Sequence, residues 1–119
     1  MLGIKVILVA ADRVPTLVFD EVDAGIGGRI ADVVGRKLRQ TARARQVLCV
    51  THLAQIAAYA DHHLGVRKTV SGTRTRTTVE VLRGDERVAE LARMLGGERV
   101  TETTLRHARE LHRSARDAG

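Results

Sequence analysis

Two short apolar runs in the first half of the chain predict strands of a parallel sheet. They are Thr16–Phe19 and Gln46–Val50, and each is almost continuous in apolar side chains. Such runs are typical of strands buried on both faces of a parallel sheet. A helix is predicted over residues 29–40 between them, and a shorter one over Leu53–Ala60. The order strand, helix, strand, helix predicts a right-handed parallel crossover.

The helix predicted over residues 29–40 has one apolar and one basic side. Its apolar side chains recur at helical spacing and should face the sheet, namely Ile30, Val33, Val34 and Leu38. The other side of the helix should face solvent with Arg36, Lys37 and Arg39.

The second half of the chain changes from apolar runs to alternation. Leu64–Lys68 and Arg74–Leu82 predict two antiparallel strands, the second with one face toward solvent because its charged positions alternate with threonine and valine. Asp85 is placed to cap a helix that ends at Gly96–Gly97. Thr101 is placed to cap a last helix, on which His107 and His112 are expected to face solvent.

The first eleven residues are mostly apolar and predict a helix rather than a strand. Lys5 interrupts them, and the polar pair Asp12–Arg13 follows. A bilayer span needs about 20 apolar residues, so this stretch is too short to cross a membrane. It also lacks the charged start and cleavage site of a signal peptide. We therefore expect no membrane partner.

The charge, aromatic content and cysteine content of the chain indicate which kinds of partner it can bind. The chain has 20 Lys and Arg against 14 Asp and Glu, a net charge of +6, which favours polyanions or leaves an ordinary solvated basic surface. With one Phe, one Tyr and no Trp, we expect no base-stacking platform for single strands. Cys49 is the only cysteine, so the chain forms no internal disulfide, and a reducing cytoplasm fits. Its apolar neighbours favour a core residue over a nucleophile.

Candidate chemistry follows the two predicted parallel strands. Asp20 and Glu21 come directly after the first, and Thr51 and His52 directly after the second. The carboxyl ends of parallel strands share one edge, where ligands of open α/β sheets bind. There a carboxylate can hold Mg²⁺, a second can orient water, and an imidazole can donate to a phosphate. This set suits hydrolysis of a nucleoside triphosphate, although Asp-Glu alone could equally be a solvated strand end.

The sequence motifs around these residues resemble those of a known family. Residues 17–28, Leu-Val-Phe-Asp-Glu-Val-Asp-Ala-Gly-Ile-Gly-Gly, resemble the Walker B motif and D-loop of SMC-like ATPases, and the last six resemble the RecN family in particular. Residues 46–57 resemble the switch-histidine loop of that family. Residues 90–97 and 101–105 resemble its C-terminal segment. The resemblance covers almost the whole chain.

The resemblance implies a fold and roles for single residues. Residues 1–119 would form the C-terminal lobe of an ABC/SMC-type ATPase head, an α/β fold of parallel strands and flanking helices with a C-terminal hairpin and helices. Asp20 would serve the Mg²⁺ shell, Glu21 would be the catalytic base or the acid that positions water, and His52 would contact the γ-phosphate. The D-loop, Ala24–Gly28, would meet a second head, and its glycines permit close backbone approach. The residues expected there are Gly25, Gly27 and Gly28.

The resemblance also implies partners and a place of action. It implies ATP and Mg²⁺ as cofactors, DNA bound through the intact protein, a second ATPase head in a homodimer, and recombinational repair of double-strand breaks in the cytoplasm at the nucleoid. The chain contains neither a Gly-x-x-x-x-Gly-Lys-Ser/Thr loop nor the Ser-Gly-Gly signature of ABC heads. We therefore interpret Met1 as an internal methionine of a longer protein, and we expect negligible ATP hydrolysis by the chain alone.

Other interpretations stay open. The chain could be a non-catalytic module that docks on an intact head, or part of another SMC or ABC ATPase. A transporter is disfavoured because that family usually has Asp where Gly27 stands. His62 and His63 could join His52 in a metal site, but no ligand spacing supports one. A further set around the predicted hairpin could contact DNA phosphates or form a solvated face, namely Lys68, Arg74 and Arg76.

Overall fold

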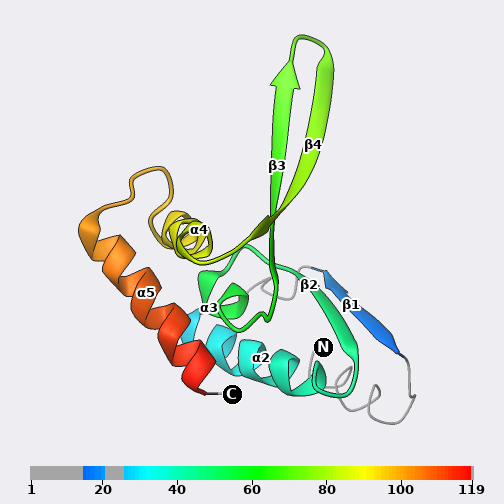
Figure 1. Ribbon diagram of the computed structural model, residues 1–119, viewed down its shortest axis with the longest axis vertical. Helices are drawn as coiled ribbons and strands as arrows, with labels where there is room; N and C mark the ends of the chain where they lie inside the picture. Colours follow the sequence, from blue (N-terminus) through cyan, green and yellow to red (C-terminus); the bar gives the residue numbers. More distant parts are fainter. Residues whose placement is uncertain (1–14, 21–25, 119) are drawn as a thin grey trace.

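The computed structural model describes residues 15–20 and 26–118 as a mixed α/β fold (Figure 1). The helix predicted within the first eleven residues lies outside these ranges. The described elements are β1 (Thr16–Asp20), α2 (Gly28–Thr41), β2 (Gln46–Val50), α3 (Ala54–Ala57), β3 (His63–Ser71), β4 (Arg74–Leu82), α4 (Asp85–Gly96) and α5 (Glu102–Asp117).

The parallel strand pair is confirmed. β1 and β2 pair in parallel from Thr16 opposite Gln46 to Asp20 opposite Val50, and α2 connects them. One face of the pair packs on α2, because its inward positions are apolar and meet small or branched residues of the helix. This core contains Leu17, Phe19, Val47 and Cys49 from the strands and Ala31, Val34 and Leu38 from α2.

The prediction that both strands are buried on both faces is wrong for the described residues. The outer face is open, with Val18 62% and Val50 60% exposed. The described helices that pack against this pair, α2 and the start of α3, contribute side chains to one face only. The apolar side of α2 is also shifted from its predicted position. Ile30 and Val33 are exposed, whereas Ala31 and Gly35 are buried.

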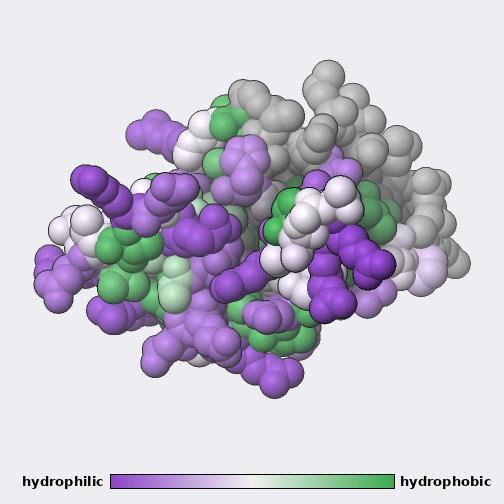
Figure 2. All heavy atoms as spheres, turned by 90° about the horizontal axis from the view of Figure 1, so that it is seen from above, coloured by the Kyte–Doolittle hydropathy of each residue, from purple (hydrophilic) through white to green (hydrophobic). Residues whose placement is uncertain are grey.

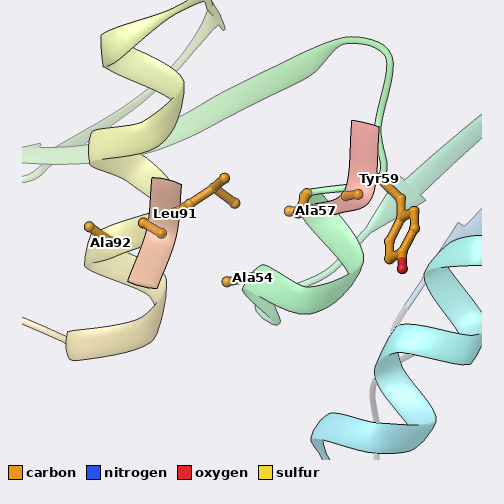
Figure 3. Close-up of a cluster of buried hydrophobic side chains, with 8 residues drawn as sticks. Ala54, Ala57, Tyr59, Leu91 and Ala92 are labelled. Carbon is orange, nitrogen blue, oxygen red and sulfur yellow. The ribbon is translucent and has the colours of Figure 1, made fainter. Parts of the chain in front are cut away.

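A second core joins α3, α4 and α5. Alanines and one leucine dominate it, so the helix axes can approach closely. Figure 3 shows Leu91 of α4 pointing toward Ala54 and Ala57 of α3, with the Tyr59 ring turned toward α2. Arg39 of α2, predicted to face solvent, donates a 2.5 Å hydrogen bond to the Ala115 carbonyl of α5 and so connects the two cores.

One predicted helix cap is confirmed, one is wrong, and one helix is shorter than predicted. The Thr101 hydroxyl accepts a 3.2 Å hydrogen bond from the Thr104 amide, as predicted for a cap of α5. Asp85, however, is the first residue of α4 and makes no cap, because Gly84 holds that position. Its carboxylate lies in the first turn, where the helix dipole favours it. The helix predicted over Leu53–Ala60 spans only Ala54–Ala57.

β3 and β4 form an antiparallel hairpin that projects from the rest of the molecule (Figure 1). Its tip is a tight turn at Gly72, whose φ of 62° favours glycine. β4 spans its predicted range, whereas β3 extends beyond the predicted Leu64–Lys68 at both ends. Nearly every residue of β4 is exposed, so the predicted single solvated face is wrong, and Val66 (67%) and Val79 (61%) lie opposite each other in solvent.

Figure 2 looks down on the hairpin end of the molecule and shows a mostly hydrophilic described surface with separate hydrophobic areas. Within the described ranges, no helix has the length and apolar character needed to cross a membrane.

Candidate functional site

The strand register brings the candidate residues to one edge. Asp20 is the last residue of β1 and lies opposite Val50, the last residue of β2. Thr51 and His52 follow Val50 directly, and both Asp20 and His52 are exposed. Parallel strands are about 4.8 Å apart, so the carboxylate and the imidazole start from adjacent strand ends. Glu21, the predicted base, lies outside the described residues.

The loop that carries His52 has its own local support. The Thr51 hydroxyl accepts a 3.0 Å hydrogen bond from the Leu53 amide, which closes a tight turn around His52. Leu53 is extended and precedes α3, while its side chain packs in the core beneath the strands. Leu53 is held in the core on one side of His52, and the Thr51 hydroxyl closes the turn on the other side, so His52 lies at the surface.

The glycines of the predicted D-loop lie partly within the described residues. Gly27 is the N-cap of α2, and its carbonyl accepts a 2.9 Å hydrogen bond from the Ala31 amide. Gly28 is the first residue of that helix, one residue before the start that the sequence predicted. A Cβ at Gly27 would meet nothing within 4 Å, so its backbone is open to approach. Gly25 and Asp23 lie outside the described residues.

The start of α2 lies beside the residues that follow the His52 loop. A Cβ at Gly28 would lie 3.8 Å from Gln55 Nε2. Deeper along α2, a Cβ at Gly35 would lie 3.2 Å from the Gln55 carbonyl oxygen. The segment after β1 and the segment after β2 therefore run side by side at this edge.

Tyr59 braces the same two segments. Its hydroxyl donates a 2.6 Å hydrogen bond to Asp32 Oδ1 on α2, and its ring covers Gly35. Burial, followed by the bond to Asp32, raises the pKa of the Tyr59 hydroxyl, so it remains a donor at neutral pH. Asp32 also pairs with Arg36 at 3.2 Å on the surface of the helix.

Arg87 of α4 stabilises the segment that follows His52, and the sequence analysis did not predict this role. It is 5% exposed and donates to the carbonyls of Ala57, Ala58 and Ala60, where α3 ends. The Ala57 carbonyl also accepts a 3.1 Å hydrogen bond from the Ala60 amide, so the guanidinium adds a second donor there and caps the carbonyls of Ala58 and Ala60. Burial lowers the pKa of Arg87. Its burial could have been predicted from its position four residues before Leu91, because residues at this spacing share one side of a helix and Leu91 lies on the apolar side of α4.

Two histidines lie near Arg87. His63 and His112 are each partly buried, which for His112 corrects the predicted solvent-facing position. Burial and then the charge of Arg87 lower the pKa of both imidazoles. The described residues contain no group of three or more His, Cys, Asp or Glu that could hold a metal ion.

Comparisons with known proteins find similarity to DNA repair proteins. It is 53% identical to DNA repair protein RecN of Streptomyces coelicolor over 98% of this chain and 20% of that protein. It is 55% identical to RecN of Deinococcus radiodurans over 93% of this chain and 19% of that protein. RecN of Bacillus subtilis is 45% identical over 97% of this chain and 20% of that protein.

The chain thus spans about a fifth of the length of the curated relatives it matches. No family model matches it. Among solved structures, it is similar to a chain from a study of ATP-driven dimerization and DNA-stimulated activation of SMC ATPases. The TM-score is 0.61 at 17% identity, over 77% of this chain and 55% of that one, which establishes the shared fold. Over nearly its whole length, the chain is homologous to a segment of the RecN family of DNA repair proteins.

Proposed function

We propose that the chain is part of an ATP-binding and hydrolysing head that acts in recombinational repair of DNA double-strand breaks. The observation that carries this proposal is the register of Asp20 opposite Val50, from which His52 follows after one residue. The names of the RecN relatives and the SMC-like fold support it. Residues 1–119 would be the C-terminal part of that head, and the phosphate-binding loop would come from elsewhere in it.

The residues at the edge suit a magnesium nucleotide. Mg²⁺ is usually held by one or two carboxylates together with phosphate oxygens and water, so one strand-end carboxylate such as Asp20 is an adequate protein contribution. Bound Mg²⁺ would neutralise charge on the phosphates. Glu21 would orient and deprotonate the attacking water, and His52 would donate a hydrogen bond to the terminal phosphate.

The glycine segment would face a second head. The open backbone at Gly27 and the start of α2 at Gly28 support a close approach by another chain, and Gly25 would belong to the same contact. In this proposal two copies of the head hold ATP between them, the intact protein contacts DNA, and it acts in the cytoplasm at the nucleoid.

The test uses a head that contains the complete ATP site. Glu21→Gln keeps the size of the side chain but removes the base, so ATP binding and head dimerisation should persist while turnover falls about 100-fold or more. Glu110→Gln is the matched control, because it makes the same change of carboxylate to amide at an exposed residue of α5, a helix that contributes no residue to the candidate site. Normal turnover in Glu21→Gln would remove Glu21 from the role of base.

The exposed outer face of β1 and β2 favours a second candidate function. Val18, Leu48 and Val50 form an apolar surface suited to docking, so the chain could act as a non-catalytic module on an intact head. Purified chain mixed with an intact head should then associate with it and change its ATPase rate. If neither association nor a change in rate is seen, this alternative is excluded.

A further inference from the structure

The projecting hairpin has two chemically different faces. Residues two apart on a strand share a face, and the β3–β4 register identifies which residues lie opposite each other. One face carries five exposed apolar side chains, Leu64, Val66, Val70, Val79 and Val81. Lys68 lies on this apolar face, opposite Thr77. Arg74 and Arg76, which the sequence analysis grouped with Lys68, lie on the other face.

The opposite face repeats one arrangement three times. On three successive rungs of this face, an arginine lies directly opposite a hydroxyl residue, and all six side chains are exposed. The rungs, from the base toward the tip, are Arg67–Thr78, Arg76–Thr69 and Arg74–Ser71. Successive rungs are about 7 Å apart, and Arg67 lies on β3 while Arg76 and Arg74 lie on β4, so the arginines form a row of donors about 14 Å long.

This arginine face, defined as those three rungs, has little negative charge near it. Residues 63–82 contain four Lys and Arg and a single acid, Glu80, which lies opposite Gly65, on the base side of the rungs. Glu80 lies on the same face, next to the Arg67–Thr78 rung, and Glu90 of α4 interacts with Arg67 but is hydrogen-bonded by Arg93. Arg74 and Arg76 therefore extend toward the tip beyond any acidic residue of the strands.

Guanidinium and hydroxyl groups together are donors suited to phosphate oxygens. The hairpin carries no aromatic side chain, so it offers no stacking surface for bases. We propose that the arginine face of the hairpin binds the phosphate backbone of duplex DNA, independently of base sequence. The choice of DNA as the polyanion rests on the proposed function, whereas the binding itself involves no part of the ATP site.

The experiment measures binding of the 119-residue chain to a labelled DNA duplex across a salt series, without nucleotide. Changing Arg67, Arg74 and Arg76 together to Gln should weaken binding at least tenfold near ~100 mM salt. The slope of log affinity against log salt should fall by about 2–3, since each phosphate contact contributes about 0.9.

Two controls separate a phosphate site from general charge. Lysine at the same three positions should retain most of the salt slope, because the charge remains. Glutamine at Arg106, Arg109 and Arg113, three exposed arginines of α5, removes the same net charge and should leave affinity within about twofold. Thermal unfolding of each variant confirms that it is folded, which is expected because every substituted side chain is exposed.

Three results would overturn the inference. They are no duplex binding by the unaltered chain at low salt, an unchanged salt slope in the hairpin glutamine variant, or equal losses in the hairpin and α5 variants. Because nucleotide is absent, none of them bears on Glu21 in the ATPase test. Conversely, normal turnover in Glu21→Gln would leave DNA binding by the hairpin intact.

Discussion

The Tyr59 hydroxyl donates a 2.6 Å hydrogen bond to Asp32 Oδ1, joining the segment behind His52 to the helix that follows β1. Tyr59 belongs to the core of α3, α4 and α5, whereas Asp32 lies on α2 beside Ala31 of the other core, so this bond holds the two halves of the candidate site in register.

Tyr59→Phe should lower the free energy of unfolding by about 1–2 kcal/mol, because the buried ring stays but Asp32 loses its donor. Urea unfolding measures the change, and Asp32→Ala with the double variant completes a mutant cycle. If the two substitutions are strictly additive, the hydrogen bond does not couple the segments.

Gly35→Ala should destabilise the chain, contrary to the usual effect in a helix. Alanine normally stabilises a helix interior by about 1 kcal/mol relative to glycine. Here the new Cβ would lie 2.5 Å from Tyr59 Cδ2 and 3.2 Å from the Gln55 carbonyl oxygen, so we expect a net loss of about 1–3 kcal/mol.

Gly28→Ala is the control for that substitution, because its Cβ would make only an ordinary 3.8 Å contact. It should leave stability unchanged or slightly higher by thermal unfolding. A Gly35→Ala variant as stable as the parent chain would show that Tyr59 does not pack against α2 as described.

Arg87→Met should lower the free energy of unfolding by about 2–4 kcal/mol. Methionine fills much of the volume but removes the guanidinium donor from the carbonyls of Ala58 and Ala60 at the end of α3, behind a buried side chain. Arg87→Lys should lose less, since it keeps one donor group. A loss below about 1 kcal/mol for Met, measured in urea, would mean that water satisfies these carbonyls.

Stability should decline with acid below about pH 6.5 because of two histidines. The pKa of His63 and of His112 is lowered from 6.5 by burial first and then by Arg87, with Arg116 adding to the effect at His112 and Glu90 opposing it at His63. The unfolded chain therefore binds more protons than the folded one below pH 6.5. The two neutral imidazoles make their full contribution to the free energy of unfolding above pH 6.5. This contribution is lost as the pH falls from 6.5 toward the lower pKa values of the folded chain.

Replacing both His63 and His112 by Asn should flatten the stability profile between about pH 7 and 5.5, measured by urea unfolding at fixed ionic strength. Glu90, whose pKa is lowered chiefly by the hydrogen bond from Arg93, acts in a separate window below 4.5. An unchanged slope in the double Asn variant would contradict the histidine assignment.

The sequence predicted elements whose signals are local. Gln46–Val50 is a strand over the whole predicted range, and Thr101 caps α5, because apolar runs and caps are read from neighbouring residues. Features that depend on tertiary contact were not predictable. The burial of Arg87 depends on α4 meeting the end of α3, and the exposure of Val18 depends on which elements cover the sheet.

The length of β3 shows the same limit. Its apolar residues become sparse after Val66, so the pattern predicted an end near Lys68. The strand continues to Ser71 because β4 supplies a partner at every position up to Arg74. For the candidate site, Asp20 and His52 were placed on one edge by the strand order alone, whereas the bracing by Tyr59 and Asp32 required the structure.

The shared edge of Asp20 and His52 can be tested by magnetic resonance on a head with the complete ATP site and the Glu21→Gln substitution. Mn²⁺ supplied with ATP should broaden the ring-proton signals of His52 and leave those of the exposed His107 on α5 sharp. The broadening should disappear in Asp20→Asn. If nucleotide and Mn²⁺ bind while the His52 signals stay as sharp as those of His107, Asp20 and His52 do not serve one nucleotide site.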